Sequence, residues 1–197
     1  AELFTVTKTL DDTEHPASRE LFSLKVLDPA MGSGHFLVEA VNFITDRLAA
    51  FLAEHPQNPI TSEIDVIRKT ILEEMEKRRI QIDATALTDE NLLKRRVMKS
   101  CVYGVDLNEM AVELAKLSLW LRSFTVGAPL SFLDHHLKCG NSLIGSMDIK
   151  EYIAPGSKRE AEFLEAVAEC LELSRIADAT GTEVARSYEL YQDARQK

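Results

Sequence analysis

Three polar residues that suit a nucleoside ligand stand at the ends of short apolar segments. Asp28, Asp106 and Asn141 each follow such a segment and precede a turn or a helix start. Because open α/β sheets bind ligands at the carboxyl ends of their strands, we expect the three to share one sheet edge. There, the two oxygens of Asp106 suit the two hydroxyls of a ribose, and the Asn141 carbonyl can accept from an adenine amino group. Leu107 is placed to pack on the adenine face.

A glycine-containing loop, residues 30–34, separates Asp28 from the first long helix. Glycine frees the backbone, so that N–H groups at the helix start can approach a ligand closely. A strict dinucleotide fingerprint would need a third glycine where this chain has Leu37. The Asp28 carboxylate would repel a pyrophosphate but suits an ammonium group. The loop therefore favours S-adenosylmethionine over NAD, while an ordinary β–α turn without a ligand stays open as an alternative.

The apolar pattern predicts three β–α units around these residues. Residues 24–27 and 101–105 form short apolar runs typical of buried strands, and residues 136–139 form a third. A helix from about residue 34 to about residue 54 follows the first strand, with apolar residues at helical spacing. Asn108 is expected to cap the helix after the second strand. The predicted fold class is α/β with a mostly parallel sheet.

Two further helical regions are predicted outside these units. Residues 60–97 have the pattern of a helical insertion, with Thr61 or Ser62 expected to cap its first helix and Thr88 its second. Two nearby prolines are expected to keep residues 55–59 out of any helix. Residues 157–197 have the pattern of a helical pair, which we expect to pack on the same core rather than to bind a partner.

Several polar clusters are expected to be structural or solvated. The basic clusters at 78–79 and 94–96 are predicted to be solvated helix faces. The histidine pair at 135–136 lacks a carboxylate or cysteine at metal-ligand spacing, so we expect a surface or loop pair and no metal. Residues 11–16 are predicted to form a loop, and residues 16–20 to begin a short helix.

Composition limits the classes of function. The chain has 197 residues, enough for one domain with a core, and a net charge of −9 at pH 7. DNA-binding modules are usually basic, so any main phosphate contacts are expected elsewhere in a larger protein. Three scattered cysteines fit a reducing compartment and neither a disulfide framework nor a zinc site. No signal peptide, membrane-spanning run or initiator methionine is present, which predicts a cytoplasmic location and a piece of a larger protein.

Three motifs resemble those of the amino-group DNA methyltransferases, the N6-adenine class. Residues 26–37 (Val-Leu-Asp-Pro-Ala-Met-Gly-Ser-Gly-His-Phe-Leu) resemble motif I, residues 103–108 (Tyr-Gly-Val-Asp-Leu-Asn) motif II, and residues 139–143 (Cys-Gly-Asn-Ser-Leu) motif III. The likeness is greatest to fused restriction–modification enzymes of type IIG and related phage-defence methylases. It implies a Rossmann-like S-adenosylmethionine-dependent methyltransferase fold with helical insertions and a core at about 20–54 and 97–146.

The same resemblance implies a role for each matched position. The segment from Asp28 to Gly34 would hold the methionine end of S-adenosylmethionine, Asp106 the ribose and Asn141 the adenine amino group, while Phe36 would close the pocket. The residues expected to bind this cofactor are Asp28, Pro29, Ala30, Gly32, Gly34, Phe36, Asp106, Leu107, Asn141 and Ser142. No catalytic residue and no metal ligand is expected.

The chain also departs from this family. The catalytic motif (Asp/Asn)-Pro-Pro-(Tyr/Phe) has no match, since the sequence contains no Pro-Pro pair, and the upstream element ending in Tyr-Thr-Pro is missing. We therefore expect the cofactor-binding part of a DNA adenine-N6 methyltransferase, inactive alone, whose DNA contacts and target-recognition domain lie elsewhere. A restriction nuclease in the same polypeptide is compatible with the resemblance. An RNA or protein methyltransferase, a nicotinamide-dependent oxidoreductase and a non-catalytic interaction domain stay open as alternatives.

Overall fold

The computed structural model describes residues 21–81, 83, 87–144, 153, 156–173 and 176–196. Within these residues, β1 (Val26–Asp28), β2 (Val102–Asp106) and β3 (Leu137–Cys139) form a parallel sheet in the order β1-β2-β3. Asp28 pairs with Gly104, and Asp106 pairs with Cys139, so the strands end close together at one edge. The predicted α/β class with a parallel sheet is confirmed. The loop and short helix expected within 11–20 lie outside the described residues.

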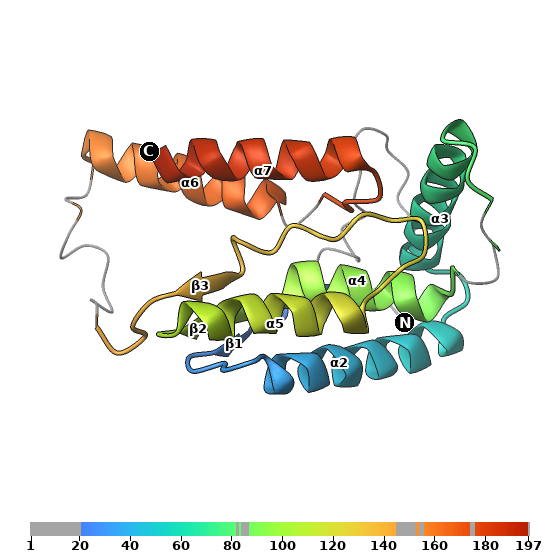
Figure 1. Cartoon of the computed structure of the whole chain (residues 1–197), viewed down its shortest axis with the longest axis horizontal. Helices are drawn as coiled ribbons and strands as arrows, with labels where there is room; N and C mark the ends of the chain where they lie inside the picture. Colours follow the sequence, from blue (N-terminus) through green and yellow to red (C-terminus); the bar gives the residue numbers. More distant parts are fainter. Residues whose placement is uncertain are drawn as a thin grey trace.

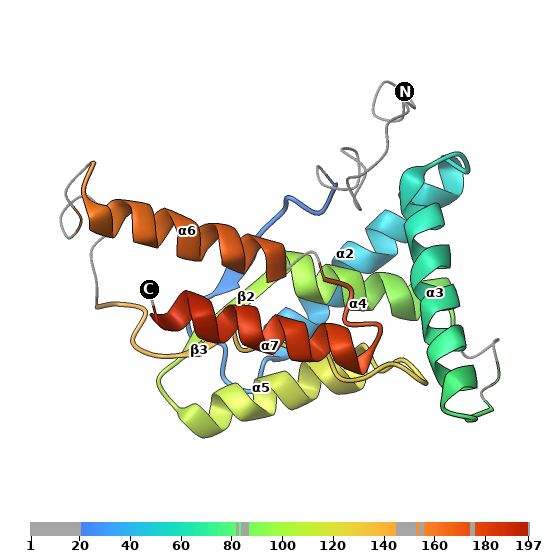
Figure 2. The ribbon, with the colours of Figure 1, turned by 90° about the horizontal axis from the view of Figure 1, so that it is seen from above.

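Helices lie on both sides of the sheet (Figure 1). On one side, α2 (His35–Glu54) and α5 (Glu109–Arg122) contact each other. On the other side, α6 (Lys158–Leu173) and α7 (Gly181–Gln196) pack as a pair, and they lie in front of the strands in Figure 2. Helix α4 (Asp89–Cys101) packs against α2 and leads directly into β2, and α3 (Pro59–Lys77) contacts α4. None of these helices is long and apolar enough to cross a membrane.

Helix α2 begins close to its predicted start because Gly34 stands before it. Gly34 has φ 81° and ψ 15°, a left-handed conformation that glycine adopts without strain. A Cβ at this position would lie 2.9 Å from the Cβ of Ala115, so glycine also permits the close approach of α5. Leu37, Val41 and Leu48 bury the inner face of α2. Burial of each such side chain contributes about 1.5–3 kcal/mol, which anchors the glycine loop to the core.

The predicted helix caps are partly confirmed. Thr88 caps α4, since its side chain accepts a hydrogen bond from a backbone N–H in the first turn at 3.3 Å. The expected cap of α3 at Thr61 or Ser62 is wrong, because the Oδ1 atom of Asn58 accepts from the Thr61 N–H at 2.8 Å. Pro59 then occupies the first helical position, where its missing N–H has no consequence. A proline that was expected to exclude a helix therefore begins one.

The first two strands differ from the prediction in burial and in position. Leu27 in β1 is 60% exposed, and Leu24, which precedes β1, is 53% exposed. The first strand is therefore not buried, and it is an edge strand of the described sheet, with β2 on one side only. The second strand starts one residue later than predicted, since Cys101 ends α4. In its middle, a Cβ on Gly104 would overlap the Sδ atom of Met31. The glycine thus makes room for the loop that follows β1.

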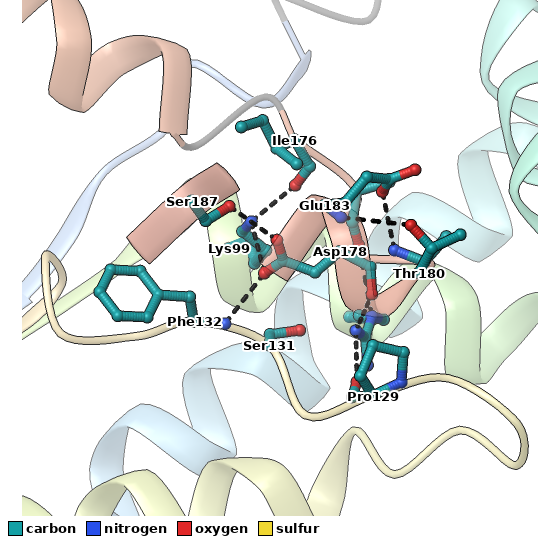
Figure 3. A network of polar contacts seen from close by, with 12 residues as sticks. Lys99, Pro129, Ser131, Phe132, Ile176, Asp178, Thr180, Glu183 and Ser187 are labelled. Atoms are coloured by element: carbon teal, nitrogen blue, oxygen red, sulfur yellow. Dashed lines mark hydrogen bonds and ion pairs between the residues drawn. The ribbon is translucent and has the colours of Figure 1, made fainter. Parts of the chain in front are cut away.

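A buried polar network connects α4 to the segment before α7 (Figure 3). The Asp178 carboxylate, which is fully buried, accepts from the Lys99 ammonium at 2.6 Å, the Phe132 N–H at 2.9 Å and the Ser187 hydroxyl at 2.8 Å. Ala179, next in the chain, belongs to the hydrophobic core. The network therefore fixes the start of α7 to the centre of the molecule.

The same network corrects the prediction for the basic cluster at 94–96. Arg95 is only 5% exposed, and its guanidinium donates to the main-chain carbonyl of Asp178 at 2.6 Å. A segment 83 residues further along the chain covers this side chain. Arg95 is thus a core residue rather than part of a solvated helix face.

Candidate functional site

The same local structure, an Asx turn, begins at the last residue of β1 and of β2 and two residues after the end of β3. A side-chain oxygen accepts a hydrogen bond from the backbone N–H two residues later in each case: Asp28 from Ala30 at 3.1 Å, Asp106 from Asn108 at 2.9 Å, and Asn141 from Leu143 at 2.9 Å. Short Asp and Asn side chains favour this turn because they replace a backbone carbonyl as the acceptor. The predicted cap at Asn108 is also confirmed, since its side chain accepts from the Met110 N–H at 3.0 Å.

Asp106 joins its own turn to the glycine loop. Its second carboxylate oxygen accepts from the Gly32 N–H at 2.9 Å, across 74 residues of sequence. The hydrogen bonds from the Asn108 and Gly32 amides lower the pKa of Asp106, which is therefore ionised at neutral pH. Each carboxylate oxygen keeps a further lone pair, so the group can still accept from a vicinal diol.

Further hydrogen bonds link the three strand-end loops to one another. They run from the Met31 N–H to the Val105 carbonyl at 3.0 Å, from the Gly140 N–H to the Asp106 carbonyl at 2.9 Å, and from the Ser142 hydroxyl to the Pro29 carbonyl at 2.7 Å. The loops after β1, β2 and β3 thus form one connected unit, which we call the strand-end site.

The structure places the predicted residues as follows. Asp28, Asp106 and Asn141 share the strand-end site, and the hydrogen bonds above also involve Pro29, Ala30, Gly32 and Ser142. Gly34 is buried at the start of α2. Phe36, 58% exposed, and Leu107, 71% exposed, leave apolar surface next to the first and second loops. The Oδ1 atom of Asn141 already accepts from Leu143, and its amide N–H groups have no acceptor among the residues that the structure describes.

Two residues that shape the site were not found by the sequence analysis. Met31 is 4% exposed and packs over Gly104, while Ala115 packs against Gly34. Gly104 was the available signal, because a glycine inside an apolar strand often marks a close approach by another part of the chain. The small size of Ala115 among the larger apolar residues of α5 was a second signal.

The histidine pair lies in the turn before β3, as expected for a loop pair, but it is not on the surface, since His135 is half-buried and His136 is buried. His136 is 2% exposed, its Nδ1 atom is hydrogen-bonded to the Val102 carbonyl at 2.6 Å, and its ring stacks on Tyr103 at 4.3 Å. Burial lowers the pKa of His136 to about 4 and that of His135 to about 2, so both rings are neutral at neutral pH.

His135 and Tyr103 also line a cavity of about 630 Å³ beside α6, away from the strand-end residues. Among the residues that the structure describes, no group of three or more His, Cys, Asp or Glu side chains is arranged to hold a metal.

Comparison with protein families gives a match over most of the chain. The model of the MmeI DNA-methyltransferase domain matches residues 10–138, which include the glycine loop and Asp106. The chain belongs to the MmeI DNA-methyltransferase domain family. A model of the Eco57I restriction-modification methylase matches residues 100–189, which include Asp106 and Asn141. The matches to these restriction–modification methyltransferases therefore cover all three strand ends.

Two curated relatives are named as type II restriction enzyme and methyltransferase. The protein of Methanocaldococcus jannaschii is 30% identical over 141 residues, which are 66% of this chain and 9% of the relative. The protein of Escherichia coli is 28% identical over 138 residues, which are 66% of this chain and 12% of the relative. The chain thus spans a small part of the length of these relatives. No solved structure matches it.

Proposed function

We propose that the strand-end site binds S-adenosylmethionine and that the chain is the cofactor-binding part of a DNA adenine-N6 methyltransferase in a restriction–modification enzyme. The observation that carries this proposal is the convergence of Asp28, Asp106 and Asn141 around one glycine loop at the carboxyl ends of parallel strands. Such edges are where open α/β sheets bind nucleotides. Helices on both sides of the sheet support a Rossmann-like methyltransferase fold, and membership of a DNA-methyltransferase family favours DNA over RNA or protein as the substrate.

The side chains have separate tasks in this proposal. Asp106 accepts hydrogen bonds from the ribose hydroxyls, with its carboxylate already oriented by the Gly32 and Asn108 amides. Asp28 attracts the ammonium group of the methionine part, and the same charge disfavours the pyrophosphate of NAD. Asn141 contacts the adenine through its carboxamide. S-adenosylmethionine supplies a methyl group on a sulfonium ion, and the chain's own contribution is to bind and orient it.

Methyl transfer to adenine requires groups beyond this site. The adenine amino group is a poor nucleophile because its lone pair is delocalised into the ring, and enzymes that modify a base must hold it outside the helix. The sequence has no Pro-Pro loop for this task, and its net charge of −9 does not favour contact with DNA phosphates. We therefore assign catalysis and DNA binding to other residues of a longer protein, in which a nuclease is also compatible with the names of the relatives.

Calorimetric titration with S-adenosylhomocysteine, and separately with NADH, tests the proposal. We expect S-adenosylhomocysteine to bind and Asp106→Ala to raise its Kd about tenfold or more, because the charged acceptor of two hydroxyls is lost. Asp193→Ala removes an exposed carboxylate from α7 and is the control, with an unchanged Kd. Tighter binding of NADH, or an unchanged Kd in Asp106→Ala, would refute the proposal. Methyl transfer to adenine-containing DNA by residues 1–197 alone would refute the assignment of catalysis to other residues.

A further inference from the structure

Ser142 has a structural partner where the motif resemblance implied a ligand. Its hydroxyl donates to the Pro29 carbonyl at 2.7 Å, across 113 residues of sequence. A serine hydroxyl has a single proton, so this bond uses its whole capacity as a donor. Both residues are exposed, and the bond therefore forms at the surface of the strand-end site rather than in the core.

The Ser142 bond closes a ring of contacts around the site. The Gly140 N–H ties the third loop to the Asp106 carbonyl at 2.9 Å, and the Asp106 carboxylate ties the second loop to the Gly32 N–H at 2.9 Å. Ser142 then connects the third loop directly back to the first. Of these three contacts, only the Ser142 bond joins the loop carrying Asn141 to the loop after β1, at the residue before the glycine loop, without passing through β2.

We infer that Ser142 is a positioning residue, which holds Asn141 and the glycine loop at a fixed separation before any ligand arrives. This inference rests on the proposed function, because it assumes that a nucleoside ligand binds between these loops. Ordering the loops in advance reduces the entropy lost on binding, so the ring raises affinity without touching the ligand. A residue that contacts the ligand would instead leave the free protein unchanged when it is removed.

Hydrogen exchange in the ligand-free chain separates the two roles. The Gly32 and Leu143 amides report on the two loops, since each donates to a strand-end side chain. We expect Ser142→Ala to speed exchange at both amides at least about threefold, because the local opening of the loops becomes easier. Ser142→Thr keeps the hydroxyl and should restore slow exchange. Ser118→Ala, which removes a hydroxyl bonded to the Leu114 carbonyl within α5, is the control and should change neither amide.

Binding measurements on the same variants complete the test. Loss of one hydrogen bond predicts a rise of about three- to tenfold in the Kd for S-adenosylhomocysteine in Ser142→Ala, with recovery in Ser142→Thr. Weaker binding with unchanged exchange would overturn the inference, since Ser142 would then contact the ligand directly. No change in either quantity would also overturn it. If the wild-type chain binds no S-adenosylhomocysteine, the proposed function fails, whereas the exchange rates still decide whether the ring exists.

Discussion

Replacing Asp178 with alanine would remove the centre of the buried network in Figure 3. The side chains of Lys99 and Asp178 are 1% and 0% exposed. Burial lowers the pKa of Lys99 to about 8, with Asp178 opposing that shift, so the ammonium is still mainly charged at pH 7. Without the carboxylate, the Lys99 ammonium would lose its counter-ion and keep the Ile176 carbonyl as an acceptor, and the Phe132 N–H and the Ser187 hydroxyl would lose the Asp178 acceptor.

The structure sets the size of the expected effect. Breaking a buried ion pair by removing one partner costs about 3–5 kcal/mol. Asp178 also has φ 52°, and the left-handed region costs an alanine about 1 kcal/mol more than an aspartate or asparagine. We therefore expect Asp178→Ala to lower the free energy of unfolding by about 4–6 kcal/mol and Tm by roughly 10–20 °C. Asp178→Asn keeps the backbone preference and one acceptor oxygen, so about half of this loss is expected.

Urea and thermal unfolding, followed by far-ultraviolet circular dichroism, measure these losses. Glu172→Gln is the matched control, because it breaks an exposed ion pair with Arg186 whose side chains are 48% and 65% exposed. That variant should stay within about 0.5 kcal/mol of the wild type. If Asp178→Ala proves too unstable to fold, Asp178→Asn provides the measurement. A loss in Asp178→Asn no larger than that in Glu172→Gln would refute the reasoning.

The remaining predictions concern His135 and the cap of α3. Burial lowers the pKa of His135 to about 2, so the folded state binds fewer protons than the unfolded chain, and stability falls as the pH drops below the unfolded value of about 6.5. When the pH falls from about 7.5 to about 5, the free energy of unfolding measured by urea titration should drop about 2 kcal/mol more in the wild type than in His135→Phe. An equal drop in the two proteins would contradict this prediction. Asn58→Ala should cost about 1–2 kcal/mol in the same assay because α3 loses its cap. Thr70→Ala, which removes a hydroxyl bonded to the Val66 carbonyl within the same helix, should cost under about 0.5 kcal/mol, and equal losses would exclude a capping effect.

Local chemistry explains which parts of the fold could be predicted. Thr88 and Asn108 were recognised as caps because a capping side chain bonds to a backbone N–H only two or three residues away. Asn58 was missed because two prolines beside it suggested a break, although a proline is well tolerated at the first helical position. The burial of Arg95 could not be predicted, since its acceptor on Asp178 lies 83 residues later.

The candidate site also combines local turns, which could be predicted, with long-range contacts, which could not. The sequence by itself determined that Asp28, Asp106 and Asn141 stand at or just after the ends of strands and begin turns, because each Asx turn needs only the amide two residues on. Only the tertiary structure decided that Asp106 holds Gly32 across 74 residues and that Ser142 bonds to Pro29 across 113. These contacts depend on the order and register of the parallel strands, which bring distant loops to one edge. Bonds between such distant loops have no signature in the local sequence, whereas a turn or a cap is encoded in a few adjacent residues.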